Sequence, residues 1–207
     1  MSATTSTVSN FVSALAARRS IYPLSKGAVI PDEKLIPLVQ EIVKQSPSSF
    51  NSQSSRVVFL LGKDHDEYWN KIVYDAVKGV SPPDQFEGAA KRLAGFAGAR
   101  LTILFYESET TVQEFQKKFA IYADRFPQWS EHASGMAQIN VWTALANEGF
   151  GCNLQHYGNL TEETIASKWN LPKDWKLKAE LVVGEKAGEA GEKGFMDDSE
   201  RFKVFGA

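Results

Sequence analysis

SPSSFNSQ, residues 46–53, is the stretch of this chain that says most about its fold, together with RRS at residues 18–20. The RRS segment offers two guanidinium groups and a hydroxyl. These groups suit a phosphate monoester, because arginine pairs bidentately with phosphate oxygens. Asn51 and Gln53 add amides, which both donate and accept hydrogen bonds along the edge of a heterocyclic ring. Together the two segments indicate a site for a phosphorylated ring compound of the flavin type.

Two later stretches support this interpretation. Residues 149–158 read GFGCNLQHYG, a glycine-rich segment, and residues 201–206 read RFKVFG, a basic tail. In their order and spacing, the four motifs resemble the FMN-binding signature of the nitroreductase family, and the resemblance extends from about residue 11 to residue 206. The sequences SPSSFNSQSSRVV, GCNLQHYG and RFKVFG most resemble those of a subgroup found in fungi and lactic-acid bacteria.

The resemblance implies an α+β protein with the nitroreductase-like fold, in which helices flank a central, mainly antiparallel sheet. It implies one FMN-binding domain over residues 1–207, and a homodimer with flavin at the subunit interface. In the tail, apolar Phe202, Val204 and Phe205 alternate with basic residues, which is typical of a strand with one apolar face. By resemblance, this C-terminal strand is exchanged with the partner subunit.

The resemblance also gives the residues that bind the cofactor. The RRS segment and one of the two basic tail residues hold the phosphate, the amides of residues 51 and 53 hold the ring edge and ribityl region, and residues 151–156 lie along the redox edge. The full set is Arg18, Arg19, Ser20, Ser49, Asn51, Gln53, Gly151, Leu154, Gln155, His156, Arg201 and Lys203. No catalytic side chain is expected, because flavin carries the hydride chemistry.

The implied activity is that of an FMN-dependent NAD(P)H oxidoreductase. NADH or NADPH is the cosubstrate, and it passes hydride to the flavin and leaves. A small planar aromatic acceptor, such as a nitroaromatic or a quinone, then takes its place in a ping-pong cycle. Two alternatives stay open: a flavin-binding regulatory protein in lipid or oxidative-stress signalling, and a flavin-free interaction protein on the same scaffold. The visible absorption spectrum separates the last from the others.

Two positions depart from the family pattern. Many members carry a basic residue two positions after RRS, where it approaches the flavin ring, but this chain has Tyr22 there. Many also have Pro-Trp after the glutamine, where this chain has Ser54-Ser55. The first departure leaves open which cation stabilises the reduced flavin. The second indicates a differently shaped substrate cavity.

Composition excludes several other classes of protein. The chain has 207 residues, 43% of them hydrophobic, which is enough for a large core. Its net charge of -2 gives no electrostatic case for nucleic acid or an anionic membrane as a partner. One cysteine fits a reducing compartment. The N-terminus lacks a signal-peptide pattern, and no apolar run reaches the roughly twenty residues that span a bilayer. We therefore expect a cytoplasmic protein, with a nuclear pool allowed.

Other chemical motifs are weak. Gly149-x-Gly151 follows an expected helix and lacks the third glycine of a Rossmann site. No metal site is expected, because the three histidines have no ligand-like spacing; they are His65, His132 and His156. Cys152 is expected to be a small buried residue, since no local base is evident that would activate it.

Purely structural roles remain as alternatives for the motif residues themselves. Arg18 or Arg19 could simply complement the C-terminal end of a helix. Gln155 and His156 could be ordinary polar loop residues. Phe126, Trp129 and Trp142 are more typical of a core than of a substrate platform, although one or two aromatic side chains are expected near a planar ligand.

Apolar periodicity predicts the order of the elements. The first expected helix ends near RRS and has its apolar stripe at Phe11, Val12, Leu15 and Ala16. A second helix begins near Pro31 and stops before SPSS, and further helices are expected at residues 64–77, 111–122, 131–148 and 161–169. Strands are expected at residues 56–61, 100–106, 177–183 and in the tail. The strand at 100–106 is a nearly continuous apolar run, which predicts burial on both faces.

Overall fold

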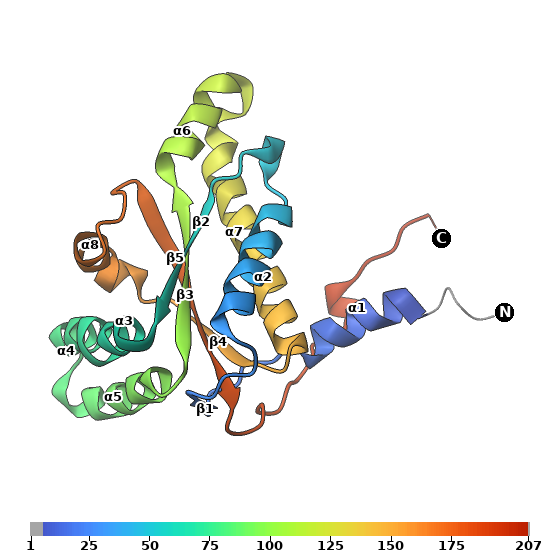
Figure 1. Ribbon diagram of the computed structural model, residues 1–207. Helices are drawn as coiled ribbons and strands as arrows, with labels where there is room; N and C mark the ends of the chain where they lie inside the picture. Colours follow the sequence, from blue (N-terminus) through green and yellow to red (C-terminus); the bar gives the residue numbers. More distant parts are fainter. Residues whose placement is uncertain (1–5, 207) are drawn as a thin grey trace.

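The computed structural model describes residues 6–206 and shows a five-stranded, mainly antiparallel sheet with helices on both faces (Figure 1). Its strands are β1 (Leu24–Ser25), β2 (Ser55–Leu61), β3 (Leu101–Ser108), β4 (Gly151–Gln155) and β5 (Trp175–Lys186). β5 pairs antiparallel with β1, β3 and β4, and β3 pairs antiparallel with β2. The predicted fold class and sheet type are confirmed.

Helices cover the two faces of this sheet. They are α1 (Ser6–Ala17), α2 (Asp32–Gln45), α3 (Gly62–Glu67), α4 (Tyr74–Val80), α5 (Pro83–Ala97), α6 (Glu109–Lys118), α7 (Phe126–Asn147), α8 (Gly158–Lys168) and α9 (Asp198–Arg201), with shorter helical segments η1 (Ser49–Asn51), η2 (Tyr68–Val73) and η3 (Ala120–Arg125). α3, α4, α5 and α8 lie on one side of the sheet, and α2 and α7 lie on the other (Figure 1). Within residues 6–206, no helix combines the length and apolarity needed to cross a membrane.

β3 is buried along its whole length, as its unbroken apolar run predicts. Leu104 and Tyr106 pack in the core under α3, α4 and α5. Ile103 and Phe105 point the opposite way and pack in a second core under α2 and α7. Alternate side chains of one strand therefore join the two helical layers through the sheet.

The sequence prediction was wrong for parts of the segment between β2 and β3. The single helix expected at 64–77 consists of α3, η2 and α4, and η2 is π-helical. α5 was not predicted at all. Its start signals are present, since Pro83 opens the helix and Asp84 lies in the first turn. Gly88 and Gly95 inside the helix lower its intrinsic propensity, and the packing of Leu93 against the core offsets that loss.

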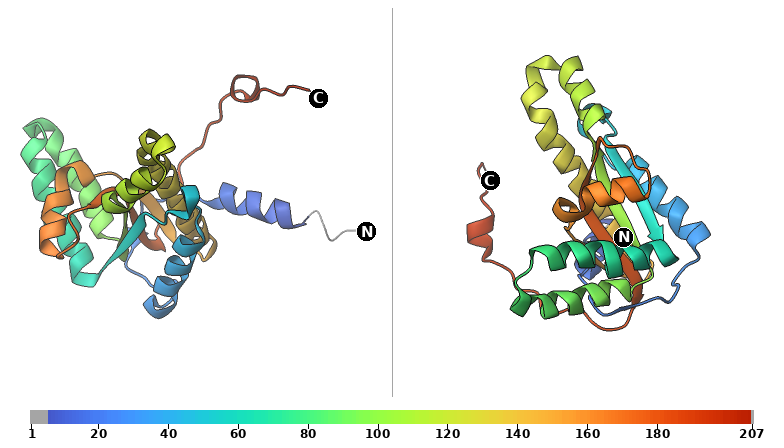
Figure 2. Two further views of the ribbon diagram at one scale, coloured as in Figure 1. Left: turned by 90° about the horizontal axis from the view of Figure 1, so that it is seen from above. Right: turned by 90° about the vertical axis from the view of Figure 1, so that its left-hand side faces the viewer.

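α1 and the chain after β5 project from the same side of the molecule, away from the sheet (Figures 1 and 2). Phe11 and Val12, in the predicted apolar stripe of α1, are 64% and 57% exposed. The predicted tail strand is not formed within this chain. Residues 198–201 are helical, and residues 202–206 pair with no strand of the described chain, because no edge of their own sheet lies beside them. Exchange of the tail between subunits stays a prediction.

Candidate functional site

The basic RRS segment lies directly beside β4. Ser20 forms a parallel bridge with Cys152, and the Ile21 amide donates to the Cys152 carbonyl at 2.9 Å. The buried Asn153 side chain donates back to the Ile21 carbonyl at 2.9 Å. Two motifs that are far apart in sequence, residues 18–20 and residues 151–156, are thus held together by backbone hydrogen bonds. Gln155, for which a loop position was one alternative, therefore lies in a strand, because β4 pairs with β5 over residues 151–155.

Two glycines are needed where the chain enters β4. Gly149 has φ +100°, which side chains rarely adopt, and it ends the turn after α7. At Gly151, an added Cβ would lie 2.5 Å from the Leu24 side chain and 3.3 Å from that of Ile21. The glycine therefore allows the segment that carries Ser20 to approach β4 closely.

The two arginines of the basic segment have different neighbours. The Arg18 guanidinium lies 4.3 Å from the centre of the Trp142 ring, a cation–π contact with α7. The Arg19 guanidinium donates to the Gly191 carbonyl in the chain after β5. Neither side chain forms an ion pair with a carboxylate of the described residues. Both positive charges therefore lack a compensating anion in this part of the chain.

Cys152 and the end of β4 complete this half of the site. Cys152 is 1% exposed, and burial raises the pKa of its thiol far above the ordinary value, so the side chain is an inert core residue as predicted. Leu154 is half-buried, Gln155 donates to the Asn153 side chain at 2.8 Å, and His156 is exposed.

A carboxylate that the sequence reasoning missed holds the end of β4. Glu180 is fully buried, and its two oxygens accept from the Tyr157 amide at 3.0 and 3.1 Å. The Tyr68 hydroxyl donates to the same carboxylate at 2.9 Å. Burial raises the pKa of Glu180 to about 7. A lone glutamate inside an otherwise apolar strand, AELVV, was the signal in the sequence.

The second motif forms a strained turn. Phe50, Asn51 and Gln53 all have φ between +50° and +54°, the left-handed region that residues other than glycine rarely adopt. The Ser48 hydroxyl accepts from the Gln53 amide at 2.9 Å, and the Arg56 side chain donates to the Gln53 carbonyl at 2.7 Å. Ser49 lies at the start of η1, and the side chains of Asn51 and Gln53 are exposed. The turn thus presents both amides to the surface.

Phe50 in this turn contacts a group of aromatic residues, which we call the aromatic cluster. The cluster consists of Phe50, Phe115, Phe119, Tyr122, Phe126 and Trp129. Phe50 is stacked on Phe119 with ring centres 4.4 Å apart, and half of its surface is exposed. Phe126 is buried, as expected of a core residue, whereas Phe50 stays half exposed in the turn that carries the two amides.

The two halves of the predicted site lie at different points along α7. Arg18 contacts Trp142, and Phe50 contacts Trp129, which is 13 positions earlier in the same helix. At about 1.5 Å per residue, these two contacts are separated by roughly 20 Å. One chain therefore brings residues 18–20 together with 151–156, but it does not bring Ser49, Asn51 or Gln53 to them.

The basic tail also lies apart from the other site residues. Arg201 and Lys203 are exposed, and neither forms a hydrogen bond or ion pair with RRS in the described chain. Arg201 lies over the Phe202 ring at 5.5 Å, and the Lys203 amine donates to the Ser199 carbonyl at 2.6 Å. The expected approach of the tail to a phosphate is not formed within one chain.

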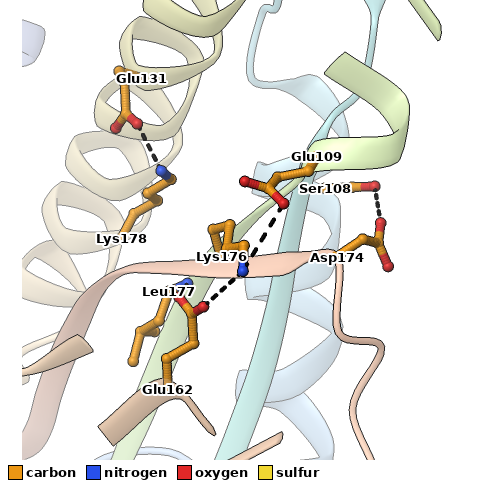
Figure 3. Close-up of polar contacts among 8 residues, drawn as sticks. All are labelled: Ser108, Glu109, Glu131, Glu162, Asp174, Lys176, Leu177 and Lys178. Atoms are coloured by element: carbon orange, nitrogen blue, oxygen red, sulfur yellow. Dashed lines mark hydrogen bonds and ion pairs between the residues drawn. The ribbon is translucent and has the colours of Figure 1, made fainter. Parts of the chain in front are cut away.

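A separate polar cluster at the start of β5 is neutralised internally (Figure 3). The Lys176 amine lies 3.0 Å from Glu162 of α8 and 3.9 Å from Glu109 of α6. Lys178 pairs with Glu131 of α7 at 2.6 Å. These lysines border a cavity of about 230 Å³ together with residues of α6 and α7. Because each lysine has a carboxylate partner, the cluster joins helices to β5 and offers no free charge for a ligand.

The basic segment bridged to a glycine-rich strand, on a mainly antiparallel sheet between helical layers, defines the nitroreductase-like class of α+β proteins. The model of the Nitroreductase family matches residues 15–185, and the chain belongs to this family of oxidoreductases. It is 35% identical over 195 residues to HBN1 of Saccharomyces cerevisiae, a protein named as a nitroreductase. That alignment covers 92% of this chain and 95% of HBN1.

Solved structures agree with the family assignment. Nitroreductase CinD from Lactococcus lactis, in complex with nicotinic acid, matches at a TM-score of 0.88 and 45% identity, covering 94% of this chain and 99% of that one. CinD is also solved with chloramphenicol and with 4-nitrophenol. A nitroreductase from Desulfovibrio desulfuricans in complex with FMN shares the fold at 19% identity and a TM-score of 0.66, covering 94% and 96% of the two chains. The yeast and lactococcal relatives confirm the fungal and lactic-acid-bacterial subgroup.

Proposed function

We propose that this protein is an FMN-dependent NAD(P)H oxidoreductase that reduces nitroaromatic or quinone-type acceptors. The observation that carries the proposal is the bridge between Ser20 and Cys152, which places a phosphate-binding segment beside the glycine-rich strand. FMN has one phosphate and one ring system, and these two segments offer donors for the first and an open backbone edge for the second. The FMN complex of the Desulfovibrio relative supports the choice of cofactor.

The donors present fit FMN in chemistry. Arg18 and Arg19 carry charges without carboxylate partners in the described residues, and Ser20 adds a hydroxyl, as a dianionic phosphate requires. Asn51 and Gln53 expose amides on a turn whose backbone strain costs free energy, and strain of this kind is concentrated at functional sites. These amides suit the carbonyl and N–H groups of the ring edge.

The site is completed by a second copy of the chain. Within one chain the amide turn lies roughly 20 Å along α7 from the contact of Arg18. A groove of about 630 Å³ runs between α1, α2 and α7, lined mainly by apolar side chains, and it ends against exposed Phe11. We propose that α1 and the groove of two chains pack together, so that each flavin takes RRS from one subunit and the amide turn from the other.

When bound, FMN supplies the hydride transfer, and the protein supplies binding and orientation. Arg18, Arg19 and Ser20 bind the phosphate. β4, fixed by its pairing with β5, orients the redox edge, and the strained turn of the partner fixes the ring edge. Donor and acceptor share one position above the ring, so the cycle is ping-pong.

The aromatic cluster favours a planar acceptor. Phe50 lies directly before Asn51 and exposes half of its surface, so it is accessible to a planar ligand bound beside the amide turn. CinD, which is 45% identical, is solved with three aromatic compounds, including 4-nitrophenol. A nitrophenol is therefore the acceptor class that we test first. A regulatory flavoprotein remains the second candidate, because neutral Tyr22 stands where many relatives carry a cation.

The visible spectrum of the purified protein and one reaction test the proposal. We expect flavin absorbance, bleached by NADH or NADPH without oxygen and restored by 4-nitrophenol or a quinone. Steady-state plots at several acceptor concentrations should be parallel. A protein that binds no FMN when reconstituted contradicts the proposal. A protein that binds FMN but is not reoxidised by any nitroaromatic or quinone supports the regulatory alternative.

A further inference from the structure

A cavity of about 470 Å³ lies where the chain leaves the basic segment. Tyr22 and Pro23 form one wall, directly after Ile21, and α5 forms the other. The α5 residues that line it are Lys91, Arg92, Gly95 and Phe96. The lining is largely apolar, with two cations at the rim, which suits a flat ring that carries a negative charge at one end.

The two cations differ in their pairing. The Lys91 amine lies 2.8 Å from Glu87 one turn earlier on α5, so its charge is partly compensated. Arg92 forms no ion pair within residues 6–206, and its side chain is exposed. The Arg92 charge acts on Tyr157. Burial raises the pKa of Tyr157, and the guanidinium opposes that rise. Arg92 therefore lies close enough to Tyr157 for its field to reach the end of β4.

The basic segment of the proposed flavin site continues into the wall of this cavity. Tyr22 is two residues after Ser20, and Tyr157 directly follows His156. The hydrogen bond of Ile21 to Cys152 keeps the two segments side by side at that point, and the chain then enters the cavity wall opposite α5 at Tyr22. A flavin with its phosphate at RRS would therefore have this cavity and its two rim cations as neighbours.

Reduction of a flavin by nicotinamide creates a charge that needs a partner. A hydride carries two electrons and one proton. Its transfer from NAD(P)H to the ring leaves NAD(P)⁺ and adds one negative charge to the ring's pyrimidine end. Tyr22 is neutral, so it cannot compensate this charge. We infer that Arg92 of α5 is the cation that binds the pyrimidine end of the reduced flavin. The inference rests on the proposed function.

The experiment compares FMN-loaded wild-type protein with Arg92→Gln and Arg92→Lys, and with Lys78→Gln of α4 as an exposed control. Two readouts do not depend on turnover: the dissociation constant of sulfite, whose addition to the oxidised ring creates the same negative charge, and the two-electron midpoint potential. Loss of a contact to a charged group typically weakens binding about ten- to hundredfold. We expect Arg92→Gln to weaken sulfite binding at least about tenfold, and to lower the potential by about 30 mV for each tenfold loss.

Arg92→Lys should retain most of the sulfite affinity and most of the midpoint potential. Lys78→Gln should match the wild-type protein in both. Unchanged sulfite binding and potential in FMN-loaded Arg92→Gln overturns the inference while leaving the proposed function intact. Loss of oxidised FMN from both Arg92 variants overturns it as well, because it assigns Arg92 to folding of the site. Absence of FMN from the reconstituted wild-type protein contradicts the proposed function itself.

Discussion

Arg18 shows how a single side chain can be positioned before its ligand is present. Its guanidinium is held over the Trp142 ring, and no carboxylate of the described chain competes for it. Holding the side chain in place lowers the conformational entropy that binding would otherwise cost. This contact makes a purely solvated helix-end charge the weaker explanation for Arg18.

We predict that Arg18→Ala weakens FMN binding by one to two decades, because a hydrogen bond to a charged group contributes about 1.5 to 3 kcal/mol. Titration with FMN, followed by the quenching of flavin fluorescence, measures this. Lys34→Ala on the exposed face of α2 is the control. Equal affinity for wild type and Arg18→Ala would return Arg18 to a role at the helix end.

Glu180 links the core to pH. Its pKa is about 7 in the folded protein, compared with an ordinary value of 4.5, because burial disfavours the charged form. The folded state therefore holds the proton more tightly than the unfolded state does. The resulting stabilisation is complete below pH 4.5 and is lost as pH rises through 7.

We predict that the contribution of Glu180 to the free energy of unfolding falls by about 3 kcal/mol as pH rises from below 4.5 to above 7. The figure follows because a pKa difference of one between the folded and unfolded states corresponds to about 1.36 kcal/mol. Urea unfolding at pH 5 and pH 8 should show a larger loss for wild type than for Glu180→Gln, which cannot ionise. Glu163→Gln, an exposed position on α8, should behave as wild type. Parallel pH profiles for wild type and Glu180→Gln would show that the carboxylate stays ionised.

Among the elements, those with a strong local pattern were predictable. β3 is a nearly continuous apolar run from Leu101 to Tyr106, and α2 has acidic residues in its first turn and buried Leu35 and Val39 on one face. α5 was missed because its glycines weaken the local signal, and its stability comes from tertiary packing of Leu93 and Phe96. The π-helical turn η2 was missed because four of its residues are buried. Their burial depends on the elements packed around them and not on a local sequence signal.

The tail is the element whose prediction depends on a second chain. Its apolar residues Phe202, Val204 and Phe205 are all more than half exposed, and no strand of the described chain pairs with it. Alternation of apolar and basic residues specifies a strand only where an edge exists to receive it. The local pattern contains no information on where that edge lies, so the tail strand stays a prediction.

We predict that deletion from Arg201 onward leaves the sheet and its cores folded but weakens both the dimer and FMN retention. Circular dichroism should be nearly unchanged, while light scattering shows monomers at concentrations where wild type is dimeric. Arg201→Gln with Lys203→Gln tests charge separately and should lower FMN affinity with little effect on the dimer. A flavin-loaded dimer after truncation would show that the tail takes part in neither.

At the scale of the whole molecule, the candidate site exists as two half-sites on one chain. The structure brings RRS, which the sequence assigns to the phosphate, into contact with β4, which the sequence assigns to the redox edge. The separation of these residues from Asn51 and Gln53 did not follow from the sequence, because motif order carries no information on which chain supplies which motif. The roughly 20 Å along α7 between their contacts is a property of the packed helices.

Mixed dimers test this arrangement. A heterodimer of one Arg18→Ala chain and one Asn51→Gly chain should have one site with both changes and one with neither, so it should bind one FMN at wild-type affinity. Glycine removes the amide of Asn51 and still adopts its φ of +53° without strain. Differently tagged chains, co-expressed and purified through both tags, provide the sample.

The matched control is a heterodimer of Arg18→Ala with Ser20→Ala, which lie in the same half-site. There both sites carry one change, and neither should bind FMN at wild-type affinity. If the Arg18→Ala and Asn51→Gly heterodimer also lacked a tight site, each flavin would be bound by residues of a single chain.

Because α7 sets the distance between the two half-sites, the number of residues in this helix is constrained in evolution. One residue inserted between Trp129 and Trp142 would rotate one end of the helix by about 100° relative to the other, and a full turn would move it about 5.4 Å along the axis. Exposed positions such as His132 and Met136 can change freely, since neither end moves. Insertions and deletions should therefore be eliminated from this helix far more strictly than substitutions, and should accumulate in the chain between β5 and α9.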